Sequence, residues 1–286
     1  MLYASAGGSF HFVFECVLAL VLIGFVGISH GAVDHILAAE VLKLLPNKKL
    51  YLFLIGYLSI VALYIAAWFV SPFLSFVLFL LYSAYHFGQA DTEIITRDLS
   101  SKFILLVRYN YGLIIISALM ISNTAYLQTI FPDWFNQSIH LADTIKYSYY
   151  VFYSSIAIQV VISIVMIAKN LVALTKLVVF SAQLILILFV FNVLPPLIAF
   201  SIYFGLWHAL LILQKEYQAF TTAKLISSIR AFIALLAPFT LLSLLGIAAV
   251  IYFSGANANI AVLVAISALA FPHTLLMDKM YSQKIG

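Results

Sequence analysis

Residues 72–90 read PFLSFVLFLLYSAYHFGQA, an apolar run that ends in a short polar island around His86. A helix of about 20 apolar residues is long enough to cross the roughly 30 Å hydrocarbon core of a bilayer. The histidine is the unusual part, because an imidazole in hydrocarbon raises the free energy of a protein unless it has a partner. This stretch therefore predicts a membrane span with a polar site in it.

The rest of the chain has the same apolar character. Of its 286 residues, 65% are hydrophobic and 8% are charged, and the mean hydropathy is +1.14. A water-soluble core could not cover so many apolar side chains, so the composition indicates one all-α transmembrane domain over residues 1–286. The net charge of +4 comes from basic loop residues and does not indicate nucleic-acid binding. The single cysteine, Cys16, excludes an internal disulfide framework.

Hydropathy predicts nine spans, with eight as the alternative. They are placed near residues 11–30, 50–70, 72–90, 103–122, 147–168, 173–193, 196–214, 230–253 and 257–277. Segment 31–45 either continues the first helix or breaks from it near Gly27, Ser29 and Gly31. The result is a polytopic helical bundle in the lipid bilayer of the cell membrane, either plasma or inner.

Basic residues alternate between the predicted loops. The loops after spans one, three, five and seven and the C-terminal tail contain Lys43, Lys48, Lys49, Arg97, Lys102, Lys169, Lys176, Lys215, Lys224, Arg230, Lys279 and Lys284. The opposite loops contain only Lys146, and Arg108 lies inside a span. Because cytoplasmic loops are rich in Lys and Arg, we expect the N-terminus outside and the C-terminus in the cytoplasm.

Four histidines lie in polar islands on spans that all run from outside to inside. They are His30, His86, His208 and His273. At about 1.5 Å per residue, each lies roughly 18–28 Å along its helix, in the inner half of the bilayer. A lone buried histidine is more often a hydrogen-bonded core residue, but four at one depth predict a shared metal ion. Imidazole ligands suit Fe, Cu, Zn or Ni.

The neighbours of these histidines have predicted roles as well. Asp34 lies one turn after His30, on the same face, and is expected to orient the His30 ring. Asp91 and Asp278 follow their histidines by five residues, so we expect them to cap helix ends or to meet basic loop residues. His11 and His140 are expected near the outer surface.

Aromatic residues flank the four histidines directly and are either packing residues or the lining of an apolar substrate site. They are Tyr85, Phe87, Tyr203, Phe204, Trp207 and Phe271. Ring faces would hold a long conjugated hydrocarbon and stabilise an electron-deficient polyene.

Taken together, the motifs resemble the Brp/Blh family, the bacteriorhodopsin-related proteins that act as β-carotene 15,15'-dioxygenases. The matching segments are His-Gly-Ala-Val-Asp-His at 30–35, Tyr-His-Phe-Gly-Gln-Ala-Asp at 85–91, residues 203–208, and Phe-Pro-His at 271–273. The resemblance implies a histidine-bound non-haem Fe(2+) that splits the central double bond of β-carotene with O2. The products would be two molecules of all-trans retinal, with a retinal-using rhodopsin as a downstream consumer.

The sequence departs from the family pattern at two positions. Ser29 stands where members have proline, which is a minor change. Ile212 stands where some members have a second histidine, one turn after the residue that matches His208. His273 is the expected replacement ligand by depth, and His35 is the reserve candidate, expected beside the ligands.

Two other classes of function use the same histidines. In a haem-binding or electron-transfer membrane protein, two of them would be axial haem ligands. In a transporter or proton relay they would titrate along a water-filled path lined by polar residues in both leaflets. The polar islands here gather toward one side, which favours the metal site.

Overall fold

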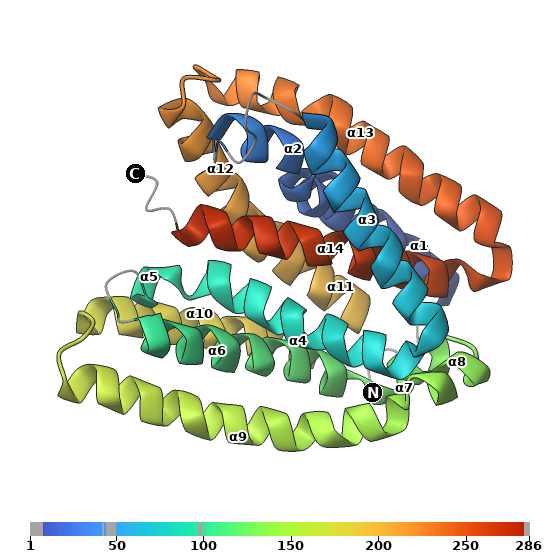
Figure 1. Ribbon diagram of the computed structural model, residues 1–286. Helices are drawn as coiled ribbons and strands as arrows, with labels where there is room; N and C mark the ends of the chain where they lie inside the picture. Colours follow the sequence, from blue (N-terminus) through green and yellow to red (C-terminus); the bar gives the residue numbers. More distant parts are fainter. Residues whose placement is uncertain (1–7, 42, 44–49, 97–98, 100, 283–286) are drawn as a thin grey trace.

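The computed structural model describes residues 8–41, 43, 50–96, 99 and 101–282. Throughout this part of the chain the secondary structure is helical, with no strand, and the helices form one bundle (Figure 1). The predicted all-α polytopic fold is confirmed. Apolar helices of this length and number make the chain a multi-pass membrane protein.

The elements follow one another without long connections. They are α1 (Gly8–Ala19), η2 (Leu20–Gly27), η3 (Ile28–Gly31), α2 (Asp34–Ile36), η4 (Leu37–Val41), α3 (Leu50–Val70), α4 (Pro72–Asp91), α5 (Glu93–Thr96), α6 (Ser101–Ser122), α7 (Thr124–Ile130), α8 (Asp133–Ser138), α9 (Leu141–Ala168), α10 (Leu174–Val193), α11 (Pro196–Ser201), η6 (Ile202–Ala209), α12 (Leu210–Thr222), α13 (Ile229–Ser254), η7 (Gly255–Asn257) and α14 (Ala258–Ser282).

By length and hydropathy, the described residues contain eight candidate spans. The last candidate, Ile229–Tyr281, is 53 residues long and includes both α13 and α14. The chain reverses between them at η7, where Gly255 has a φ of +50° that favours glycine. Figure 1 shows α14 running back toward the end of the bundle from which α13 starts. Counted separately, the two helices would bring the candidate spans of the described residues to nine, the number that hydropathy predicts.

Several predicted boundaries were too short. Helix α9 begins at Leu141 instead of near 147, and α12 continues to Thr222 instead of ending near 214. Both extensions are polar, so a hydropathy window does not detect them. The short helices α7 and α8, between the fourth and fifth spans, were also missed.

The first span is the irregular one. It extends over Phe14–Val41 and changes from α-helix to π-helix in η2 and then to 3-10 helix in η3. The regular helix is interrupted before Asp34, where Val33 has φ −109° and ψ 17°. The predicted break near Gly27, Ser29 and Gly31 is therefore present, a little later than expected.

Helices α4 and α6 pack together with their backbones in close contact. A Cβ atom on Gly88 would lie 1.8 Å from the Arg108 carbonyl oxygen, and one on Gly112 would lie 1.7 Å from the Ala84 carbonyl oxygen. Only glycine fits at such a crossing, a pattern typical of helix pairs in membranes. This contact fixes the position of α4 and therefore of His86.

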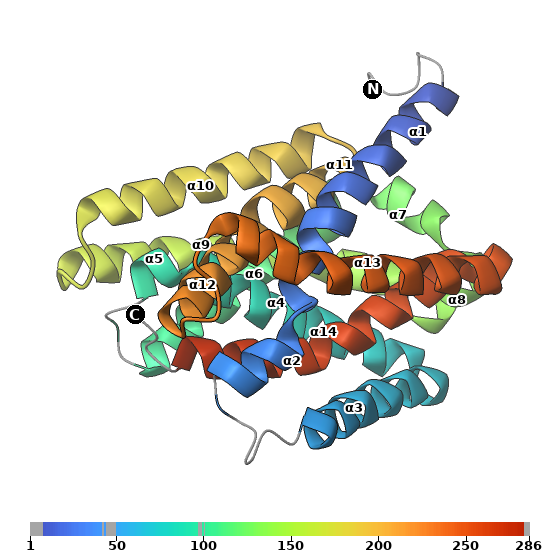
Figure 2. The same ribbon diagram turned by 90° about the horizontal axis from the view of Figure 1, so that it is seen from above.

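Helix α14 lies in the interior and packs against α3, α4 and α13. Seen from above, α10 and α3 lie at opposite edges of the bundle, with α4 and α14 between them (Figure 2). The bundle interior is therefore lined by α4, α14 and the two irregular segments η3 and η6.

Candidate metal centre

The four predicted histidines meet in the bundle interior. They come from different elements, with His30 on η3, His86 on α4, His208 on η6 and His273 on α14, and none is more than 5% exposed. The His86 ring centroid lies 4.8 Å from that of His208 and 5.1 Å from that of His273. The His30 ring lies 4.9 Å from His273 and 5.8 Å from His208. Common depth along the four spans thus corresponds to a real cluster.

Three of these residues have the spacing of a metal site. One ring nitrogen each from His30, His86 and His273 lie within 4.8 Å of one another. His208 does not belong to that tightest set, but its ring packs edge-on against His86. The cluster therefore consists of three converging imidazoles with a fourth directly beside them.

Several ring nitrogens in the cluster have no hydrogen-bond partner among the described residues. They are Nδ1 of His30, both nitrogens of His86, and Nε2 of His208 and His273. A buried polar atom left without a partner costs about 1–3 kcal/mol. Convergent, unpartnered imidazole nitrogens are the donor set that a transition metal ion requires, so the residues present fit such an ion.

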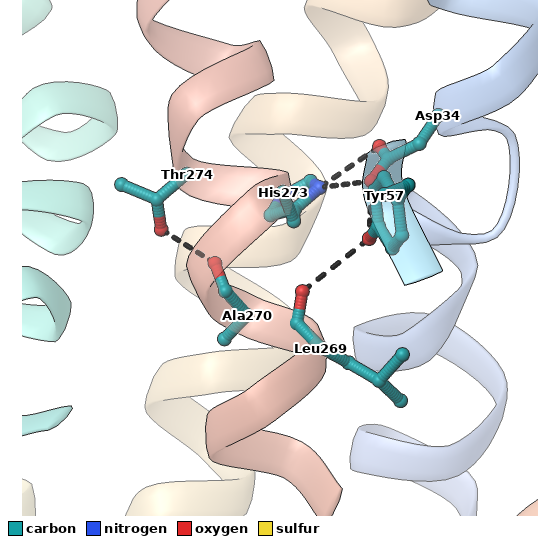
Figure 3. Close-up of polar contacts among 6 residues, drawn as sticks. All are labelled: Asp34, Tyr57, Leu269, Ala270, His273 and Thr274. Carbon is teal, nitrogen blue, oxygen red and sulfur yellow. Dashed lines mark hydrogen bonds and ion pairs between the residues drawn. The ribbon is translucent and has the colours of Figure 1, made fainter. Parts of the chain in front are cut away.

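Asp34 positions one of the rings. Its carboxylate accepts a hydrogen bond from Nδ1 of His273 at 2.9 Å and a second from the Tyr57 hydroxyl at 3.0 Å (Figure 3). The prediction that Asp34 orients His30 was wrong. The helix is interrupted between the two residues, so the one-turn spacing does not place them on one face, and Asp34 instead reaches across to α14.

Asp91 does the same for a second ring. One carboxylate oxygen lies 3.3 Å from Nδ1 of His208, and the other accepts a hydrogen bond of 2.8 Å from the Tyr203 hydroxyl. Asp91 is only 4% exposed, so it does not meet basic loop residues at the surface as predicted. A carboxylate on Nδ1 leaves Nε2 of the same ring free for a metal, which makes Asp91 a functional residue that sequence reasoning missed.

Asp278 was also expected to cap a helix end or meet a basic loop. It lies inside helix α14 and accepts hydrogen bonds from the Tyr85 hydroxyl at 2.5 Å and from Gln89 Nε2 at 3.0 Å. Both partners are on α4. The five-residue spacing places each aspartate toward a neighbouring helix, and the sequence does not indicate which helix that is.

Irregular helix geometry places His30 and His208. His208 lies within the π-helix η6, and His30 lies in the 3-10 helix η3 that directly follows the π-helix η2. The two π-helices pack against each other, and Gly27 and Gly205 allow the close approach. A Cβ on Gly27 would lie 2.5 Å from the Phe204 ring, and one on Gly205 would lie 2.6 Å from the Leu22 carbonyl oxygen. Wide helical turns of this kind are frequent at functional sites.

A proline precedes the fourth histidine. Pro272 has no N–H group and so removes one backbone hydrogen bond from α14. Tyrosine hydroxyls bond to carbonyls in the preceding turn, Tyr57 to Leu269 at 3.3 Å and Tyr82 to Ser267. Because Tyr57 also bonds to Asp34, the same contacts hold the helix and the His273 ring (Figure 3).

The predicted aromatic residues divide into two groups. Phe87 lies with its ring centroid 4.7 Å from His208, and Phe204 lies 5.6 Å from His30 and 5.8 Å from His208. Tyr203 packs on Phe87 and reaches the site through Asp91. These three rings line one side of the histidine cluster.

The other three aromatic residues have different neighbours. Tyr85 bonds to Asp278 and packs against Tyr109, while Phe271 stacks on Tyr64 at 5.7 Å. Trp207 is half-buried and packs against the core beside α6 and α10. No ring contact with a site histidine is recorded for these three in the described chain.

The reserve ligand candidate, His35, and the other described histidine outside the four, His140, do not belong to the cluster. His35 is half-buried, with its ring 4.5 Å from that of Phe239 on α13. Ile212, fully buried, fills the position of the missing second histidine with apolar packing. His140 is exposed at the start of α9, and the side chain of His11 lies outside the described residues.

Comparison with known proteins agrees with the motifs. The family model described as "Beta-carotene 15,15'-dioxygenase" matches residues 21–281, which includes all four histidines and both carboxylates that hold them. No curated protein matches the chain significantly. No solved structure does so either.

Proposed function

This chain belongs to the β-carotene 15,15'-dioxygenase family, and from that premise we propose that it splits the central 15,15' double bond with O2 at one ferrous ion held by His30, His86, His208 and His273. The family membership predicted from the motifs is confirmed, and with it the dioxygenase activity. The iron, its ligands and the position of cleavage are the proposal. It rests on one observation above all, the convergence of buried imidazole nitrogens that have no hydrogen-bond partner in the described structure.

Each protein residue has a defined part in holding the ion. His86 and His30 would offer unpartnered nitrogens to the ion. His208 and His273 would offer Nε2, because Nδ1 of each ring donates a hydrogen bond to a carboxylate, Asp91 and Asp34 respectively. The carboxylates fix the ring orientation and the tautomer, and they raise the basicity of the coordinating nitrogen. Two of the four ligands are thus set by residues on other helices.

Iron fits the reaction better than the other metals that imidazole accepts. When bound, Fe(II) would supply the redox-active centre that O2 needs in order to react with a closed-shell alkene. Zinc has no redox chemistry. The uncharged imidazoles leave the full positive charge on the ion, and no general base is needed beside it.

The rings of Phe87 and Phe204 would hold the polyene beside the ion. Both rings contact site histidines; Phe87 is buried and Phe204 is partly buried. Aromatic faces attract a polyene by dispersion and stabilise positive charge that develops on it. The apolar substrate would reach these rings from the lipid bilayer, and the retinal formed would return there for use by a retinal-binding rhodopsin in the same cell membrane.

The geometry disfavours the haem alternative. Two axial ligands must stand on opposite faces of a macrocycle that is far wider than an imidazole. Here the rings of His208 and His273 both contact His86, and all the ring separations recorded among the four histidines are 6.2 Å or less. The third and fourth imidazoles occupy the space that the porphyrin would need.

The test is direct. Purified protein in detergent is incubated with β-carotene and ferrous ion in air, and the products are separated by chromatography. We expect retinal as the sole carotenoid product, formed at two molecules per β-carotene. Longer apocarotenals would contradict central cleavage, and turnover at full rate in the protein stripped of metal would contradict the iron.

A further inference from the structure

A polar cavity of about 410 Å³ lies where α4, α10, α12 and α14 end together. Its walls include Asp91 and Glu93 from the end of α4 and start of α5, Lys176 and Gln183 from α10, Gln214, Lys215 and Gln218 from α12, and Tyr281 from α14. Such a lining does not suit a carotenoid, because hydrocarbon gains nothing from carboxylate and amide groups. The cavity must therefore serve something other than the apolar substrate.

One wall of this cavity belongs to the metal centre. Asp91 lines the cavity and also lies 3.3 Å from Nδ1 of His208. Only the Asp91 carboxylate therefore separates the cavity from His208, one of the proposed ligands. The aromatic wall formed by Phe87 and Phe204 lies against the histidine rings themselves.

Behind the cavity lies a buried carboxylate that the proposed reaction does not use. Glu216 on α12 is completely buried, and neither of its oxygens has a hydrogen-bond partner in the described part of the chain. It lies close enough to Asp34 for electrostatic interaction, and Asp34 holds His273. Tyr281 lines the cavity and interacts with the charges of both Glu93 and Glu216. Tyr281 thus connects the cavity with this carboxylate.

We propose that the cavity and Glu216 form the route by which a hydrated divalent cation reaches the four histidines. This inference rests on the proposed iron site. Oxygen donors suit a cation that is losing its water shell. The cavity supplies the carboxylates of Glu93 and Asp91 and the side-chain amides of Gln214 and Gln218. Glu216 would be the last donor before the histidines.

The lining contains charges of both signs, the carboxylates of Asp91 and Glu93 and the lysines Lys176 and Lys215. Lys215 forms an ion pair with Glu93 and lies 4.2 Å from the Tyr281 ring centroid, so its charge is already engaged. Further in, the side chains of Asp91 and Glu216 offer carboxyl oxygens as donors to a cation.

The experiment blocks the cavity reversibly. Gln214→Cys and Gln218→Cys are made in a Cys16→Ser background, because Cys16 is the single native cysteine and is exposed. Each protein is stripped of metal, labelled with a trimethylammonium methanethiosulfonate, and mixed anaerobically with ferrous ion. The uptake rate and the final iron content are measured with a chelator that colours free iron.

The control is Thr221→Cys, which is exposed on the same helix but is not part of the cavity lining. We expect the label on residue 214 or 218 to slow uptake by about tenfold or more without changing the final iron content, because a charged plug opposes cation arrival. Removal of the label by reduction should restore the parent rate. The label on residue 221 should have no effect.

Glu216→Gln tests the inner step, since it keeps the shape of the side chain and replaces one carboxyl oxygen donor with an amide nitrogen. We expect slow uptake with normal final content, whereas Asp278→Asn should load at the parent rate because Asp278 is held by Tyr85 and Gln89. Equal uptake rates in all labelled and unlabelled proteins would overturn the route while leaving the iron site intact. A loss of final content in parallel with the rate would also overturn it, by showing damage to the site. If the parent binds no ferrous ion, the iron site and the route both fail.

Discussion

Asp34 and Asp91 each hold Nδ1 of a histidine that lies on a different helix. Carboxylates in this position keep the ring oriented and the coordinating nitrogen basic, and their loss usually weakens metal binding by about 10- to 100-fold. We therefore expect Asp34→Asn and Asp91→Asn to lower iron affinity by that amount, measured by competition with a chelator.

The matched control is Asp278→Asn, which removes a membrane carboxylate that bonds to Tyr85 and Gln89 instead of a histidine. Its iron affinity should stay at the parent value. Equal affinities in all three variants would show that the carboxylates do not support the metal site.

Phe204 tests the aromatic wall, because its ring contacts both His30 and His208. Phe204→Leu keeps an apolar side chain but removes the flat ring face that would hold a polyene. Truncating a buried ring costs about 1–3 kcal/mol of packing and cation–π stabilisation, so activity should fall about tenfold or the cleavage position should shift. Trp207→Leu is the control, because the Trp207 ring packs against the core and contacts no site histidine among the described residues. Parent activity and product in Phe204→Leu would show that this ring is only packing.

For single residues, the sequence predicts how deep each histidine lies along its helix, but it does not predict how each helix is rotated about its own axis. The rise per residue converts the numbers of His30, His86, His208 and His273 into a common level, and the structure brings them together there. The partner of an aspartate depends on how each helix is turned. The pairing of Asp34 with His273 could not be predicted because it follows from the interruption at Val33.

Among the elements, the crossing of α4 and α6 has the closest backbone contact. A methyl group on Gly88 would lie 1.8 Å from the Arg108 carbonyl oxygen, so Gly88→Ala must push the helices apart. Overpacking of this kind costs about 1–3 kcal/mol, and it would also displace His86, two residues away. We expect a lower unfolding temperature in detergent and a lower iron content.

Gly56→Ala is the control, since a methyl group there meets nothing within 4 Å. It should leave the unfolding temperature unchanged or slightly raised, because alanine favours helix. A normal unfolding temperature for Gly88→Ala would contradict the close packing of α4 against α6.

The lengths of the wholly apolar helices were predictable, whereas polar helix ends such as the start of α9 and the irregular helices were not. Apolar runs identify α3, α10 and α13 to within one residue. A π-helix such as η6 has the same composition as an α-helix, and its close contact between Gly205 and Leu22 depends on how two segments distant in the chain pack. Hydropathy has no information about that contact.

For the whole molecule, the distribution of basic residues predicts the orientation. Figure 1 shows the α9–α10 connection, α5 and the end of α14 at one end of the bundle, and α7, α8 and the α13–α14 turn at the other. The first end has the Lys-rich loops and should face the cytoplasm. Asn170→Cys in the α9–α10 connection and Ala256→Cys in η7 would report the two sides, in a Cys16→Ser background.

A membrane-impermeant thiol reagent applied to intact cells should label Ala256→Cys and spare Asn170→Cys, and both residues are exposed. Inverted vesicles should give the opposite pattern. Labelling of Asn170→Cys in intact cells would reverse the orientation and place the polar cavity outside.

The central claim is that four histidines from four helices hold one ferrous ion. Iron per chain, measured in purified His30→Ala, His86→Ala, His208→Ala and His273→Ala proteins against the parent and His35→Ala, tests it most directly. We expect one iron per chain in the parent and in His35→Ala, and a marked loss in each of the other four, with the fold retained by circular dichroism. Full iron in two or more of those four variants would contradict the four-histidine site.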